Sequence, residues 1–204
     1  MSVVKILSAE QIEFIFTIPM AIQAVERAYL EKHSGQSGTC STVFPEFDPN
    51  HADLDIKSGH LGGGNTYGLK VVSSFRANPV KGLPALLGTS LLFDLSTGTP
   101  KALLNAGGIS RKAEPALFCT AQVFGDDGGQ CLSVGECEIP HKKGILTGLL
   151  EEIGGVMAGA VPGRTAPEDI TVFDSTGIAL QDLASAASIL EAADRANLGT
   201  NVEL

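Results

Sequence analysis

An alternation of apolar and polar residues between positions 52 and 105 constrains the fold of this chain most strongly. Ala52, Leu54 and Ile56 alternate with two aspartates and a lysine, a period of two that is typical of a half-buried strand. Turn-forming residues then separate further apolar segments, which predict strands over residues 67–76, 86–95 and 100–105. Consecutive strands with short connections predict an antiparallel meander.

Helices are predicted ahead of this meander. Ser8 followed by Gln11 has the spacing of a capping box and predicts a helix over residues 9–16. Pro19 suits the first turn of a second helix over residues 19–33. Residues 35–50 are rich in Gly, Ser and Pro and predict a loop. The first half of the chain is therefore predicted to consist of two helices and an antiparallel sheet.

The second half of the chain has a different pattern. Short strands are predicted over residues 123–126 and 170–173, and helices over residues 143–158 and 178–196, the last of them ended by Gly199. Short strands that alternate with helices are typical of an α/β domain. The charge changes as well, because residues 131–204 hold 11 acidic and 4 basic side chains. We therefore predict an α+β fold in which a truncated α/β segment follows the antiparallel-sheet domain.

Composition excludes several classes of function. A net charge of −9 argues against binding of nucleic acid, which needs a basic surface. No apolar stretch reaches the roughly 18 residues of a membrane span, and the first residues lack the layout of a signal peptide, so a cytoplasmic protein without membrane contact is expected. Cys131, Cys137 and His141 match no common zinc module, so no metal site is predicted and the thiols are expected to be reduced.

Motifs for nucleotide binding are also absent. Gly62 and Gly64 have the first spacing of Gly-x-Gly-x-x-Gly, but Tyr67 stands in the third position and the run lies between two predicted strands. Lys70, in the middle of an apolar strand, carries the most informative charge. Such a lysine either extends to solvent at an edge or holds an anion inside a pocket. Lys57 on the preceding strand shares that face, and two ammonium groups together would suit a carboxylate ligand.

Several segments in a fixed order resemble the ornithine cyclodeaminase/mu-crystallin family over nearly the whole chain. In the first half they are residues 55–59 (DIKSG), 68–72 (GLKVV), 78–79 (NP), 82–84 (GLP) and 91–94 (LLFD), followed by Thr97-Gly98. In the second half they are residues 126–127 (DD), 130–136 (QCLSVGE), 162–164 (PGR), 170–177 (ITVFDSTG) and 181–183 (QDL).

The resemblance implies an NAD(P)-dependent ornithine cyclodeaminase or cyclic-imine (ketimine) reductase that acts on small amino or imino acids. It implies that Lys70 is the retained catalytic and substrate-binding lysine, with Lys57 as a second substrate-binding group. Ser175, Thr176 and Gly177 would lie on a strand-to-helix turn near the nicotinamide, although a simple helix N-cap explains them equally well. Relatives form dimers through the sheet, so a homodimer is expected.

The chain resembles a shortened member of this family. We predict a substrate-binding and dimerisation domain over residues 1–110, a remnant of the nucleotide-binding domain over residues 117–177, and a C-terminal helix over residues 178–204 that returns to the first domain. About 100 residues of the Rossmann domain, with its glycine fingerprint and the family's catalytic aspartate, are missing near residues 111–120. Weak binding of NAD or NADP, or none, is therefore expected. The alternative to a surviving activity is a non-catalytic oligomerisation or small-ligand-binding module.

Overall fold

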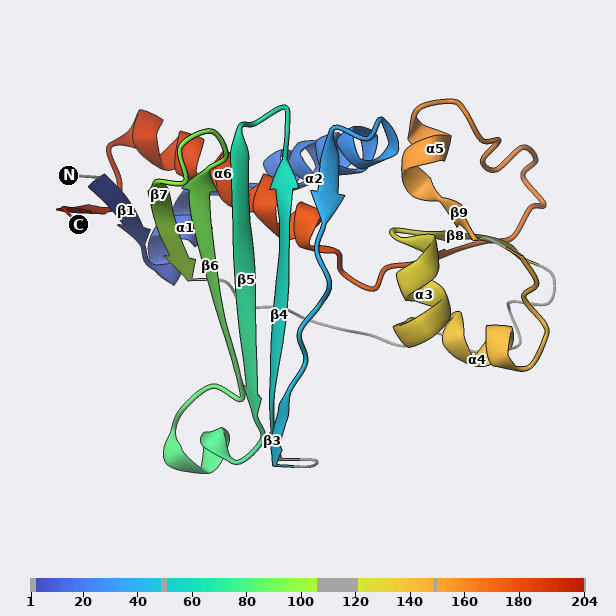
Figure 1. Cartoon of the computed structure of the whole chain (residues 1–204), viewed down its shortest axis with the longest axis horizontal. Helices are drawn as coiled ribbons and strands as arrows, with labels where there is room; N and C mark the ends of the chain where they lie inside the picture. The colour runs from blue at the N-terminus through green and yellow to red at the C-terminus, as the bar shows by residue number, and fades with distance from the viewer. Residues whose placement is uncertain (1–2, 49–50, 106–120, 149, 204) are drawn as a thin grey trace.

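A computed structural model describes residues 3–48, 51–105, 121–148 and 150–203. In these residues the chain forms an eight-stranded sheet with helices packed on it, and a smaller three-stranded sheet with its own short helices (Figure 1). The predicted α+β fold is therefore confirmed. No helix of the described residues is long and apolar enough to cross a membrane.

The large sheet has the order β11-β1-β7-β6-β5-β4-β2, and β3 pairs with β4. Its strands are β1 (Val3–Leu7), β2 (Ser37–Thr39), β3 (Glu46–Asp48), β4 (Ala52–Leu61), β5 (Thr66–Phe75), β6 (Leu86–Asp94), β7 (Pro100–Asn105) and β11 (Thr200–Glu203). Strands β4 to β7 form the predicted antiparallel meander. β1 runs parallel to β7 and pairs with β11 from the far end of the chain.

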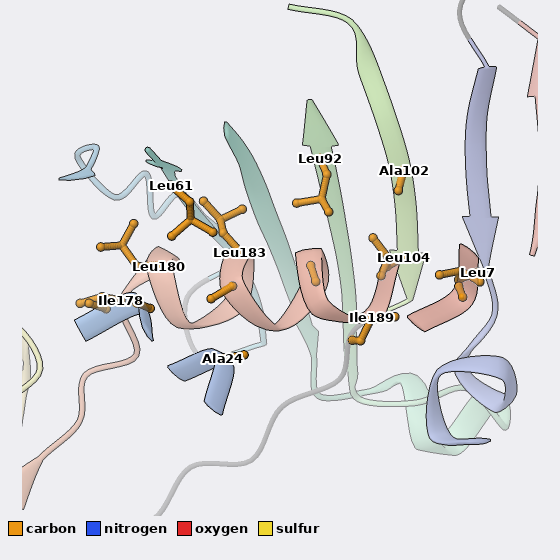
Figure 2. Packing of buried hydrophobic residues seen from close by; sticks show 14 of the residues in the cluster. Leu7, Ala24, Leu61, Leu92, Ala102, Leu104, Ile178, Leu180, Leu183 and Ile189 are labelled. Atoms are coloured by element: carbon orange, nitrogen blue, oxygen red, sulfur yellow. The ribbon is translucent and has the colours of Figure 1, made fainter. Parts of the chain in front are cut away.

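Three α-helices and a 3₁₀ turn accompany this sheet. They are α1 (Ala9–Ile15), α2 (Ile18–His33), α6 (Ala179–Ala196) and the 3₁₀ turn η1 (Asn78–Lys81). The predicted capping box is present, since the Ser8 hydroxyl accepts from Gln11 N and the Gln11 side chain accepts from Ser8 N. Pro19 lies in the first turn of α2, as predicted. α6 crosses the sheet, and its buried leucines pack against those of β4, β6 and β7 (Figure 2).

The two faces of the large sheet are buried to different extents. α6 covers the face that carries Gly59 of β4 and Gly68 of β5, where an added Cβ would contact the side chains of Leu180 and Leu183 on the helix. Leu61, Leu92, Ala102 and Leu104 on the covered face are buried. The opposite face carries apolar side chains that are only half-buried: Ile56, Leu69, Val71, Leu91 and Leu103. Within the described residues, no helix covers that apolar face (Figure 1).

The smaller sheet is parallel and has the order β10-β8-β9. Its elements are β8 (Gln122–Gly125), α3 (Gly128–Val134), α4 (Glu138–Lys142), β9 (Glu151–Glu152), α5 (Ile153–Met157) and β10 (Thr171–Asp174). β8 and β10 agree with the strands predicted there. The chain leaves β10 through a turn at Ser175–Gly177 and enters α6, which returns to the large sheet.

Several local predictions are wrong. Residues 143–158 do not form one helix, because Gly144 and Gly148 adopt positive φ angles of 71° and 95° that end a right-handed helix. The predicted loop over residues 35–50 contains β2 and β3, and the sequence analysis missed β1 and β11. α6 ends at Ala196, as predicted, but the left-handed residue that caps it is Asn197, with a φ of 52°, rather than Gly199. The predicted end of the first domain at residue 110 and the predicted gap near residues 111–120 lie outside the described residues.

The half-buried apolar face supports the expected homodimer. Association through this face removes apolar surface from water in both copies, as in a sheet-to-sheet interface. We expect a dimeric mass by size-exclusion chromatography with light scattering at micromolar protein. Leu91→Lys, which places an ammonium group on that face, should give monomers. A monomeric mass for the parent chain would contradict this prediction.

Candidate functional site

Lys57 and Lys70 lie side by side on the helix-covered face of the large sheet. They are direct partners in the register of β4 and β5, and their side chains are 19% and 15% exposed. Since side chains on a strand alternate between faces, Asp55, two residues before Lys57, lies on this face as well. The sequence analysis placed both lysines on one face, and the structure brings them together beneath the beginning of α6.

The ammonium group of Lys57 joins the two sheets. Its Nζ donates to the carbonyl oxygens of Thr176 and Gly177 over 3.0 and 2.6 Å, and it lies 3.6 Å from Asp55 Oδ2. An ammonium group has three donors. Two donors of Lys57 are therefore hydrogen-bonded to the turn that follows β10, and Asp55 lies within ion-pair distance, so this side chain holds the turn against the large sheet.

Asp126 holds the same turn from its other side. Its carboxylate is 1% exposed and accepts from the backbone N–H groups of Thr176 (3.1 Å) and Gly177 (2.8 Å). It also accepts from the hydroxyls of Ser175 (3.1 Å) and Thr176 (2.9 Å). The turn's N–H groups thus bind Asp126 and its carbonyls bind Lys57. One signal for this role is present in the sequence: Asp126 directly follows β8, and parallel neighbouring strands end at the same edge of a sheet.

Lys70 makes a different set of contacts. Its Nζ donates to Asp182 Oδ1, in the first turn of α6, over 2.8 Å. Among the described residues Asp182 is the one acceptor that its ammonium group reaches, so two of its three donors are uncommitted there. Lys70 is therefore better placed than Lys57 to bind an anionic ligand.

Other reactive side chains near the turn are poor proton acceptors or nucleophiles. Burial raises the pKa of Tyr29 to about 12, and the Gln181 amide donates to its hydroxyl oxygen. Burial also raises the pKa of Cys131 to about 12, and it raises the pKa of Cys137. These groups are protonated at neutral pH. No three His, Cys, Asp or Glu side chains in the described part of the chain are grouped so that they could hold a metal ion.

The turns that follow β8 and β10 of the small sheet do not fit a dinucleotide. Pyrophosphate binds to free N–H groups at the beginning of a helix. After β8, the N–H groups of Asp127 and Gly128 donate to the carboxylates of Asp126 (2.9 Å) and Glu152 (3.1 Å). After β10, the turn donates to Asp126, as described above. Carboxylates thus occupy the donors that an anionic cofactor would need.

A cavity in the described part of the chain lies away from the two lysines. It has a volume of about 830 Å³ and lies beside the C-terminal half of α6, with Lys5, Arg27 and Lys101 in its wall. Lys5 pairs with Asp194 over 2.5 Å, and Lys101 with Asp94 over 3.3 Å. The third cation, Arg27, lies 3.9 Å from Glu31 Oε1, so each cation of the wall has a carboxylate within 4 Å.

The fold joins an eight-stranded, mostly antiparallel sheet to a small parallel sheet, and two adjacent lysines lie beneath the helix that follows the small sheet. The sequence profile of the ornithine cyclodeaminase/mu-crystallin family matches residues 2–117 and residues 112–197. The chain belongs to this family.

Two curated relatives show how the chain compares in length. Iminosuccinate reductase of Paracoccus denitrificans is 38% identical over 95 residues, which are 46% of this chain and 29% of that protein. Alanine dehydrogenase of Archaeoglobus fulgidus is 24% identical over 318 aligned positions, which cover 97% of this chain and 98% of that protein. Because this chain has 204 residues, at least 114 of those positions have no counterpart in it.

Solved structures share the fold. The archaeal alanine dehydrogenase dimer with bound NAD gives a TM-score of 0.89 at 22% identity and covers 100% of both chains. Iminosuccinate reductase of Paracoccus denitrificans in complex with NAD⁺ gives 0.90 at 18%, also with full coverage. The Δ1-pyrroline-2-carboxylate reductase of Thermococcus litoralis, in complex with NADH and L-proline, gives 0.87 at 18% and covers 97% of this chain and 100% of that one.

Proposed function

We propose that this chain binds a small α-amino or α-imino acid on the helix-covered face of its large sheet, with Lys70 holding the ligand's carboxylate. The observation that carries the proposal is the Lys70 side chain, which is 15% exposed and whose ammonium group has one acceptor, Asp182, among the described residues. A charge-assisted hydrogen bond to a carboxylate is strong where water is largely excluded. The names of the relatives, which are reductases and dehydrogenases of amino and imino acids, support the same ligand class.

The reaction expected of the family is transfer of hydride between a nicotinamide and the α-carbon of such an acid. The turns of the small sheet do not fit the cofactor, so no hydride step is assigned to this chain. In our proposal Lys57 is a positioning residue for the Ser175–Gly177 turn, and this turn keeps the nucleotide-domain remnant against the substrate face.

A second candidate function is a non-catalytic oligomerisation module. The half-buried apolar face of the large sheet favours it, because that face is suited to a second copy of the chain whether or not a ligand binds. Ligand binding distinguishes the two functions, since an oligomerisation module has no need of the Lys70 ammonium group.

Lys70→Ala tests the proposed function. We expect it to weaken binding of L-proline, measured by NMR titration of the whole chain, by about tenfold to a hundredfold, because truncating one partner of a desolvated ionic contact costs about 2 kcal/mol or more. Lys81→Ala, at an exposed lysine of η1, is the matched control and should leave the affinity unchanged. Equal affinities of parent and Lys70→Ala, with both chains folded by circular dichroism, would reject the ligand role.

A further inference from the structure

One oxygen of Asp55 is buried beside the two lysines without a hydrogen-bond partner. Asp55 Oδ2 lies 3.6 Å from Lys57 Nζ, whereas Oδ1 is shielded from solvent and no donor in the described part of the chain reaches it. Buried polar atoms in folded proteins nearly always have a hydrogen-bond partner, so an atom without one needs an explanation. An ionised carboxylate oxygen is an acceptor only, and the group that explains this atom must therefore be an N–H or O–H donor.

The position of Asp55 relates this acceptor to Lys70. Asp55 pairs in register with Val72, and the next pair on this face is Lys57 with Lys70. Asp55 and Lys70 are thus diagonal neighbours on one face of the sheet, a separation that long side chains and a small ligand can bridge. The other nearby carboxylate, that of Asp182, already accepts from Lys70.

An α-amino acid or a protonated α-imino acid carries the complementary pair of groups. Its carboxylate needs donors, and the nitrogen on the adjacent carbon supplies N–H groups. We infer that Asp55 Oδ1 accepts from the α-nitrogen of the ligand whose carboxylate Lys70 binds, which makes Asp55 the residue that selects nitrogen over oxygen at that position. This inference rests on the proposed function. A buried acceptor left unpaired by the wrong ligand is an effective basis for discrimination.

Two ring compounds of nearly the same shape test the assignment. L-Proline has a protonated ring nitrogen, and (S)-tetrahydrofuran-2-carboxylate has in its place an ether oxygen that donates no hydrogen bond. In NMR titrations of the whole chain, we expect the parent to bind L-proline about tenfold or more tightly than the ether acid. Asp55→Asn and Asp55→Leu should reduce that preference to about twofold or less, mainly by weakening the binding of L-proline.

Asp53→Asn is the matched control, because Asp53 lies on the same strand and face, one pair further from the lysines. It should keep the preference of the parent. Equal binding of the two acids by the parent, or a preference retained in both Asp55 variants, would overturn the role of Asp55 and leave the proposed function standing. Failure of the parent to bind either acid would overturn the proposed function and this assignment together.

Discussion

Asp126→Asn is expected to destabilise the chain by about 3 kcal/mol, the largest effect of a single side chain that the structure predicts. One carboxylate oxygen accepts from Thr176 N, Thr176 Oγ1 and Asp127 N, and the other accepts from Gly177 N and the Ser175 hydroxyl. Asparagine keeps the shape but replaces one of these oxygens with a donor. Whichever way the amide turns, at least one backbone N–H in a buried site then faces another N–H.

The neighbouring residue provides the control. Asp127 caps α3 by accepting from Gln130 N over 2.9 Å, and it lies 3.3 Å from Lys32 Nζ. Asparagine is as good an N-cap as aspartate, so Asp127→Asn should cost about 0.5 kcal/mol. Urea unfolding followed by circular dichroism measures both free energies of unfolding. If the two variants lose the same stability, Asp126 does not hold the turn in the way the structure shows.

The sequence predicted the strands of the meander well because their pattern is local. β7 has the predicted bounds, β6 differs from its prediction by one residue at one end, and β5 differs by one residue at each end. Which face the helices cover was not predictable in this way. Leu69 and Val71 have the composition of a core, yet α6 packs on the opposite face, where glycines allow the helix to approach. A sheet face that a second copy of the chain can cover has the same alternation of apolar residues as a face that a helix covers, so the sequence does not tell the two apart.

The candidate site was predictable only in part, for the same reason. Lys57 and Lys70 share a face because the register of two adjacent strands places them there, and the sequence contains that information. The partners that decide what each lysine does come from distant segments: Thr176 and Gly177 occupy Lys57, and Asp182 pairs with Lys70. Tertiary contacts over more than 100 residues therefore separate two lysines that look equivalent in the sequence.

The nucleotide cofactor is where the chain should differ most from its relatives. We expect dissociation constants for NADH and NADPH in the millimolar range or no measurable binding, which corresponds to about 4 kcal/mol of binding free energy or less. Most of the affinity for a dinucleotide comes from the pyrophosphate, held by free N–H groups at a glycine-rich turn that opens a helix. The sequence has no Gly-x-Gly-x-x-Gly, and at least 114 positions of the archaeal alanine dehydrogenase have no counterpart in it.

The carboxylates beside the small sheet also weaken binding of an anionic cofactor. The turn after β8 donates to Asp126 and Glu152, and the turn after β10 donates to Asp126, so a diphosphate at either turn would meet carboxylates in place of free donors. Fluorescence titration with NADH and NADPH measures the affinity, with archaeal alanine dehydrogenase, solved with bound NAD, as the positive control. Saturation at micromolar cofactor would show that another part of this chain rebuilds the site. The missing positions would then not limit activity, and hydride transfer at the Lys70 site would become the better description of its function.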